Sequence, residues 1–324
     1  MQFLRQVLVP DVAQAASTVR TDDLPVNPLS HIIFTIKGLN DTGTLTDFTV
    51  SSALLSFISK IEVLFQGSAI ISGSAHDLAR LHGVLLRKSP RAGVIDSTDN
   101  DIRSLSFIIP LGRSLYDPKE CFPAVRRGEL VLQTTSGAAV TGVDGHILQI
   151  ETVEILAATP ERYLKATTIS KTPAATGDHE VDLPIGNQLA GVLLFGTTIP
   201  IGAAWTTSID QCRLMVDGSE AYYGNANWEC LNGDLGALVQ ANSQTSEHVH
   251  VSDVAAAYTQ WQDTDLNAVA YDFYKQYAYL DLDPRKDDQY LLDTKGRARV
   301  NLKITAGDTN AIRVLPVELV PVAG

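Results

Sequence analysis

The chain has 324 residues, of which 45% are hydrophobic and 19% carry a charge, so wholesale disorder is excluded. Its formal net charge of −12 argues against direct binding to nucleic acid, because Lys and Arg are the residues that hold the phosphate backbone. Three cysteines without a CxxC pair predict neither a disulfide framework nor a zinc site, and the length favours about two domains.

The N-terminal residues 1–28 are rich in Ala and Val and contain Pro10 and Pro25. We interpret them as an N-terminal arm. A first domain is then expected over 29–158 and a second domain over 159–324.

Most of the remaining chain has the pattern of β-strands. Short β-branched or alternating apolar segments recur between Gly, Asp, Asn and Pro turns. The clearest are 31–38, 60–72, 105–112, 128–137, 146–156, 180–186, 188–198, 211–224, 277–284, 298–307 and 311–320. Helical spacing is confined to 74–88, which starts with a Ser N-cap, and to 252–262 and 266–277. Strands and helices do not alternate, which favours an all-β sandwich or barrel.

One charge-free stretch, 183–209, is long enough to span a bilayer. Pro184 and Pro200 interrupt it, and its continuous apolar part, 189–196, has only the length of a strand. We therefore expect buried strands in this region.

An internal repeat relates the two halves of the chain. Three segments of the first half align in the same order with three of the second: 61–68 with 212–219, 130–137 with 300–307, and 148–156 with 312–320. The spacings between them differ, as loop insertions between fixed strands would produce. Two copies of one β-domain, joined near 157–162, are therefore predicted.

Each copy contains about eight strands in roughly 150 residues, with one long excursion, which is typical of a jelly roll. An immunoglobulin sandwich would be shorter and would show a Cys–Trp–Cys pattern. The predicted class is thus all-β, with two tandem eight-stranded jelly rolls and short helices in the long loops.

The repeated segments, with 105–137 and its counterpart 277–307, resemble the major capsid proteins of the double jelly-roll lineage. That lineage includes adenovirus hexon and the capsid proteins of tailless icosahedral phages and archaeal viruses with an internal membrane. The resemblance covers roughly residues 29–320. It is architectural and includes no signature peptide.

The resemblance implies a major capsid protein without catalytic activity or cofactor, found in the virion after synthesis in the host cytoplasm. Three copies would form a pseudo-hexameric homotrimer that contacts neighbouring capsomers and tiles an icosahedral shell. Residues 1–28 would dock onto a neighbour, a minor capsid or vertex protein, or an underlying membrane; the alternative is a frayed tail. The loops over 74–88 and 225–276 would build the outer face. Direct contact with nucleic acid is not expected.

Two histidines have the spacing of a metal site on a strand. His248 and His250 would point to the same side, where imidazoles can bind a metal. Cupins place a Glu three or four residues further on, but Val254 and Ala255 stand there. The alternative is a pair of surface-loop histidines.

Two groups of acidic residues complete the candidate sites. Asp96, Asp99 and Asp101 could supply oxygens to calcium, but the EF-hand spacing is absent, and solvated turns are the alternative. Asp281 and Asp283 share a strand face, as glycosidase carboxylates do, but the third acid of the jelly-roll glycosidases is missing.

A carbohydrate-binding or receptor-binding tandem jelly roll is the alternative function. It predicts a monomer with an exposed aromatic platform. The best candidates for that platform are Trp205, Trp228, Trp261, Tyr222 and Tyr223, all in the second half.

Overall fold

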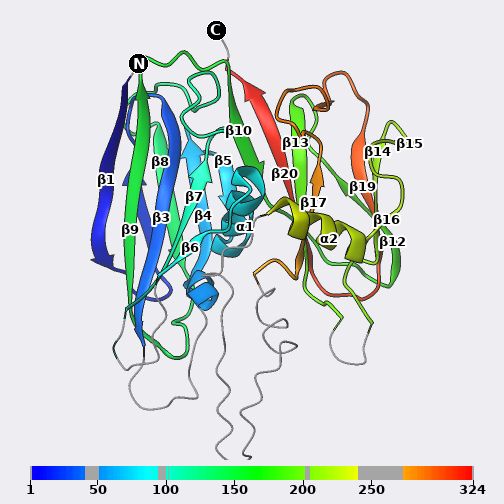
Figure 1. The fold of residues 1–324 in the computed structure, drawn as a ribbon, viewed down its shortest axis with the longest axis horizontal. Helices are drawn as coiled ribbons and strands as arrows, with labels where there is room; N and C mark the ends of the chain where they lie inside the picture. The colour runs from blue at the N-terminus through cyan, green and yellow to red at the C-terminus, as the bar shows by residue number, and fades with distance from the viewer. Residues whose placement is uncertain are drawn as a thin grey trace, which may run out of the picture.

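A computed structural model describes residues 2–40, 51–93, 100, 102–200, 205–239 and 273–322. Strands form two sandwiches that lie side by side along the longest axis of the molecule (Figure 1). The all-β class predicted from the sequence is confirmed.

The first sandwich packs two antiparallel sheets face to face. One has the order β1 (Gln2–Ala13), β9 (Val143–Leu156), β3 (Leu29–Asn40), β7 (Ile102–Pro110) and β6 (Arg91–Ala92). The other has the order β2 (Val19–Asp23), β8 (Leu130–Ser136), β4 (Ile58–Phe65) and β5 (Ser68–Gly73). Apart from the short β6, these are the eight strands of a jelly roll.

The second sandwich repeats this order strand for strand. Its first sheet contains β10 (Arg162–Thr167) and β11 (Ile169–Lys171), then β20 (Ile312–Pro321), β13 (Gln188–Gly196) and β17 (Tyr277–Asp281), with β18 (Leu292–Asp293) beside β13. Its second sheet contains β12 (Gly177–Asp182), β19 (Val300–Ala306), β14 (Gln211–Val216) and β15 (Ser219–Glu220), with β16 (Ala226–Asn227) beside β14. The predicted tandem of jelly rolls is therefore confirmed.

The aligned sequence segments occupy equivalent places in the two sandwiches. β4 and β14 both end in a two-residue turn, at Gln66-Gly67 and at Asp217-Gly218. The φ angles are 49° and 83° in the first turn and 50° and 83° in the second. Two successive positive φ angles define a type I′ hairpin turn, which matches the twist of the flanking strands and favours Gly at its second position.

Residues 1–28 do not form the separate arm that the sequence predicts. β1 pairs antiparallel with β9, and β2 pairs antiparallel with β8, so this segment supplies the first two strands of the first jelly roll. The pattern was missed because β1 is an edge strand that exposes most of its side chains, and no alternation of apolar and polar residues marks it. Pro10 fits there because an edge strand tolerates a missing N–H.

One sheet runs through both jelly rolls. β10 pairs antiparallel with β20 of the second jelly roll and parallel with β5 of the first, so the two halves share ten strands in a continuous ladder. The sheet that contains β13, β17 and β20 is buried on both faces. One face packs inside the second sandwich, and the other joins the core of the first.

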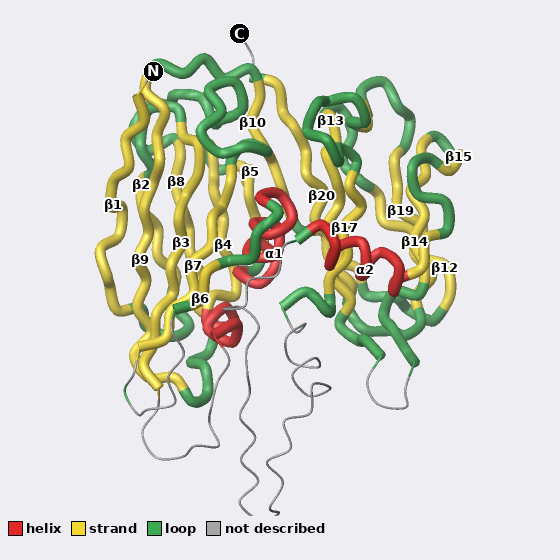
Figure 2. The backbone as a smooth tube through the Cα atoms, viewed as in Figure 1, coloured by secondary structure: helices red, strands yellow, loops and turns green. Residues whose placement is uncertain are grey.

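A helix comes after the β4–β5 hairpin in the first jelly roll, and another comes after the corresponding β14–β15 hairpin and the short β16 in the second (Figure 2). α1 (Ala75–Leu86) confirms the helix predicted over 74–88, and the Ser74 hydroxyl caps it by accepting the N–H of Asp77. α2 (Trp228–Leu238) was not predicted. A short 3-10 helix, Ser51–Phe57, precedes β4.

Two further helix predictions fall largely beyond the described residues. The helix expected over 252–262 lies wholly outside them, and only the end of the one expected over 266–277 is described. There, residues 273–276 form turns and Tyr277 begins β17. Neither α1 nor α2, among the described segments, is long and apolar enough to cross a membrane, and the apolar stretch at 189–196 lies in β13.

Candidate functional site

The predicted metal-site residues cannot be placed in the fold. His248, His250, Asp96, Asp99 and Asp101 all lie outside the described residues. Within the part of the chain that is described, no group of three or more His, Cys, Asp or Glu side chains is arranged to hold a metal ion.

The predicted aromatic platform is split between the core and the surface. Trp228 is 3% exposed and packs in the core of the second jelly roll. The Tyr223 hydroxyl donates to the backbone oxygen of Asp281. Trp205 is 83% exposed and Tyr222 is 53% exposed, whereas Trp261 lies outside the described residues. The five aromatic residues therefore do not form one stacking surface.

The most developed polar arrangement lies between the two jelly rolls, where α1 meets β20. Asp77 on α1 is 2% exposed and receives two hydrogen bonds from Arg313, at 2.8 and 2.9 Å. The Tyr277 hydroxyl donates to the same carboxylate at 2.9 Å. The Arg313 guanidinium also lies 3.5 Å from the centre of the Phe195 ring. Burial raises the pKa of Tyr277, so its hydroxyl keeps its proton and remains a donor.

Replacing Asp77 with asparagine is expected to lower the free energy of unfolding by about 2 kcal/mol, because Arg313 then lacks its carboxylate in a partly buried site. Urea denaturation measures this loss. Asp23→Asn at an exposed position on β2 is the control, and it should change stability by less than about 0.5 kcal/mol. Equal stability of the two variants would contradict the role assigned to Asp77.

A second charged cluster lies at the other side of the junction, around Arg113. This guanidinium is 5% exposed and makes ion pairs with Glu120, Asp283 and Asp288. Arg162, at the start of β10, also contacts Glu120 and Asp288. Arg113 and Glu120 of the first jelly roll, together with Arg162 of β10, are thus connected to Asp283 and Asp288 in the loop after β17.

Burial and pairing act in opposite directions on these groups. Burial alone would raise the pKa of Glu120, but the hydrogen bonds and charge of Arg113 hold it below its usual value. Burial raises the pKa of Asp283 although Arg113 opposes that effect. For the ammonium of Lys286, whose charged form is the protonated one, burial lowers the pKa.

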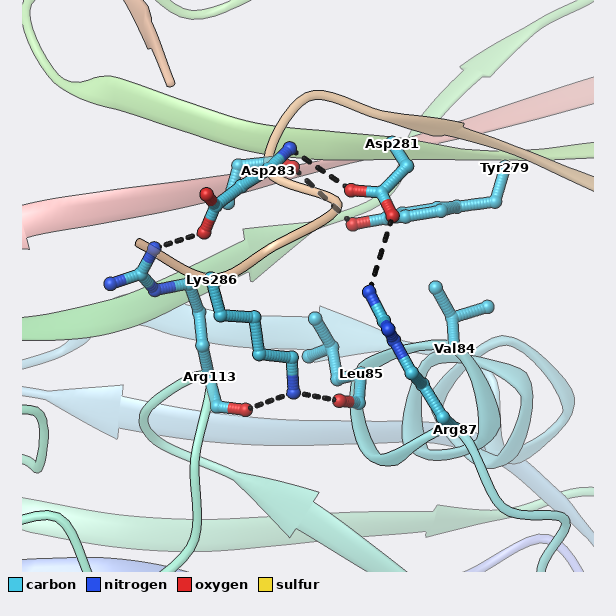
Figure 3. Close-up of a pocket in the computed structure, with 9 residues that line it drawn as sticks. Val84, Leu85, Arg87, Arg113, Tyr279, Asp281, Asp283 and Lys286 are labelled. Atoms are coloured by element: carbon cyan, nitrogen blue, oxygen red, sulfur yellow. Dashed lines mark hydrogen bonds and ion pairs between the residues drawn. The ribbon is translucent and has the colours of Figure 1, made fainter. Parts of the chain in front are cut away.

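The enclosed cavity beside Lys286 is too small for a ligand. The ammonium of Lys286 donates to the backbone oxygens of Arg113 and Leu85, and Asp283 faces Arg113 (Figure 3). The cavity that these residues line, with Tyr279 on its far side, has a volume of about 20 Å³, which holds about one water. The cluster therefore connects the two jelly rolls, and on its outer side Arg113, Glu120, Arg162 and Asp288 line an open polar pocket of about 300 Å³. Asp281 and Asp283, considered above as a carboxylate pair, line the enclosed cavity.

The junction could hardly be found from the sequence. Asp77 and Arg313 are 236 residues apart, and Arg113 and Asp283 are 170 apart. A local signal is confined to the polar residues Asp77, Arg80 and His82 among the buried positions of α1.

No family model matches the sequence, and no curated protein is similar to it at the sequence level. Solved structures, in contrast, match nearly the whole chain. The major capsid protein of Sulfolobus turreted icosahedral virus is 14% identical, with a TM-score of 0.70, and the match covers 99% of this chain and 97% of that one. The major capsid protein of bacteriophage PM2 is 11% identical, with a TM-score of 0.62 and coverage of 99% and 98%.

A chain of the PBCV-1 virus capsid is 8% identical, with a TM-score of 0.60 and coverage of 98% and 94%. The fold is that of the double jelly-roll major capsid proteins. In this double jelly roll the likeness extends over both sandwiches and the junction between them, so it does not depend on one domain alone.

Proposed function

We propose that the chain is a major capsid protein: a structural, non-catalytic component of a virion that forms homotrimers and tiles an icosahedral shell with its own copies. The observation that carries the proposal is the match over 99% of this chain and 97–98% of two viral major capsid proteins. The two charged clusters at the junction support it, because each pairs a buried residue of one jelly roll with a residue of the other.

The same proposal includes the wider set of contacts. Neighbouring capsomers are the principal partners, with minor capsid or vertex proteins and an underlying membrane as further ones. The net charge of −12 is consistent with a shell that does not bind the genome directly.

The first prediction concerns oligomeric state. Light scattering on the purified protein is expected to give about 105 kDa, three times the chain mass of 35.0 kDa, and electron micrographs should show a hexagonal outline. A species of 35.0 kDa at all protein concentrations would contradict the proposal.

A further inference from the structure

Because the two jelly rolls are joined through one sheet edge of each, a different sheet edge remains at each end of the molecule. Inside the chain, the edge strand β5 of the first jelly roll pairs with β10 of the second. The counterpart of β10 in the first jelly roll is β1, and the counterpart of β5 in the second is β15. Both lie at the end of a sheet in the described part of the chain, and Figure 2 shows them at opposite ends of the molecule.

Residues buried at the internal junction have exposed apolar counterparts at these ends. In the aligned segments 148–156 and 312–320, Glu154 on β9 is equivalent to Glu318 on β20. Leu4 pairs with Glu154 and Lys165 pairs with Glu318, so Leu4 corresponds to Lys165 and Phe3 corresponds to Leu164. Leu164 is fully buried, whereas Phe3 is 58% exposed. The same edge strand also exposes Leu4 and Val7, and exposed apolar side chains beside unpaired backbone groups can be covered by a partner strand.

The β15 end shows the same contrast. Ile71 follows the turn residue Gly67 by four positions and is fully buried against β10. Tyr222 follows Gly218 by four positions and is 53% exposed. Each end therefore presents a large apolar side chain where the internal junction has a buried one.

The sheet faces show the same contrast: the face at the internal junction is covered, and its counterpart at the β1 end is open. In the second jelly roll, Leu193 pairs with Tyr279 and packs in one core with Val84 of α1. A cavity of about 20 Å³ borders Val84 and Tyr279 there. Ile33 and Ile108 form the corresponding pair in the first jelly roll and line an open groove of about 440 Å³.

The helix that would fill this groove is present at the other end of the chain. α1 is buried on nearly all sides, whereas α2 exposes small and acidic residues: Glu229, Cys230, Gly233, Asp234, Gly236 and Ala237. Lys88 and Arg91 line the groove and are both exposed, so the charges are complementary. Small side chains allow close approach of the helix.

We infer that the β1 end of one copy, comprising β1 and the groove at Ile33 and Ile108, receives the β15 end of a second copy, comprising β15, Tyr222 and α2. The contact between copies repeats the contact within the chain. It is head-to-tail, and such contacts form a closed ring when the rotation closes. The inference rests on the proposed trimer and names its contact surfaces.

Thiol cross-linking tests the predicted pairing directly. Asp77 is the third residue after the N-cap of α1 and contacts Arg313; Cys230 is the third after the N-cap of α2. The counterpart of Arg313 on β9 is Gln149, which is half-buried on the outer face of its sheet. We therefore expect a short bis-maleimide to join Cys230 to the thiol introduced by Gln149→Cys, giving covalent dimers and trimers on a denaturing gel.

Three controls make the result specific. Cys230→Ser in the Gln149→Cys background should abolish the cross-link, since Cys121 and Cys212 are buried. Lys60→Cys, at an exposed position on β4, should give none. Adding Phe3→Asp to the Gln149→Cys chain should lower the cross-linked fraction about tenfold, because burial of the ring is lost.

The outcomes separate the two proposals. Trimers with the Gln149–Cys230 cross-link support both. Trimers by light scattering that do not cross-link at these positions, or that cross-link equally from Lys60→Cys, overturn the head-to-tail surface and leave the proposed function intact. A protein that remains monomeric overturns both.

Discussion

Replacing Arg113 with methionine is expected to lower the free energy of unfolding by about 3–5 kcal/mol, because the buried carboxylate of Asp283 would lose its cation and that of Glu120 would keep only Arg162. Glu120 and Asp283 are both 4% exposed, and neither can be hydrated without opening the junction. The measurement is chemical denaturation monitored by intrinsic fluorescence. The expected loss is a large part of the stability of an ordinary domain.

Two further variants test whether the loss of buried charge pairing causes the lower stability of Arg113→Met. Arg285→Met removes an exposed cation that pairs with Asp287 at 3.0 Å, and it should cost less than about 1 kcal/mol. Adding Glu120→Gln and Asp283→Asn to Arg113→Met should recover part of the loss, because the uncompensated charges are removed. If Arg113→Met is as stable as Arg285→Met, the cluster does not hold the jelly rolls together.

Acidification is expected to produce the second large effect, through buried histidines. Burial lowers the pKa of His82 to about 4, and its Nδ1 accepts the N–H of Ile108 at 2.7 Å, which requires the neutral ring. Burial, with a smaller contribution from Arg5, also lowers the pKa of His31 to about 4.

The direction of this pH effect follows from the pH at which the folded and the unfolded chain each bind a proton. The unfolded chain takes up protons near pH 6.5 and the folded chain only near pH 4, so the stability is fully present above pH 6.5. It is lost as the pH falls from 6.5 to 4, and His82 alone contributes about 3 kcal/mol of that loss. Urea denaturation across this range measures the slope.

The matched variant is His82→Gln, which keeps an acceptor for Ile108 but cannot take up the proton. It should be less sensitive to acid than the parent chain. His179→Gln on β12 serves as the control and should retain the parent's slope. An identical slope in the His82→Gln chain would show that His82 is not responsible.

Much of the fold could be predicted from the sequence because several strands, such as β7 and β8, have one buried and one half-buried face. β8, for example, alternates buried and half-buried side chains along its whole length, and it aligned correctly with β19. The two N-terminal edge strands lack this signal: β1 exposes most of its side chains, and β2 alternates only between exposed and half-buried ones, so both were assigned to an arm.

The site was beyond prediction for a different reason. Arg113, Glu120 and Asp77 are ordinary charged residues in sequence, and only the long-range pairing of β5 with β10 brings their partners to them. Local spacing instead singled out histidines and aspartates that lie outside the described residues.

The strand β10 has one further consequence. Because it is hydrogen-bonded to both β5 and β20, a change of the angle between the two jelly rolls would have to break this ladder. A shell built from such subunits cannot bend within a chain. Any change of curvature, from a flat facet to a folded edge, must then be accommodated at the contacts between separate molecules.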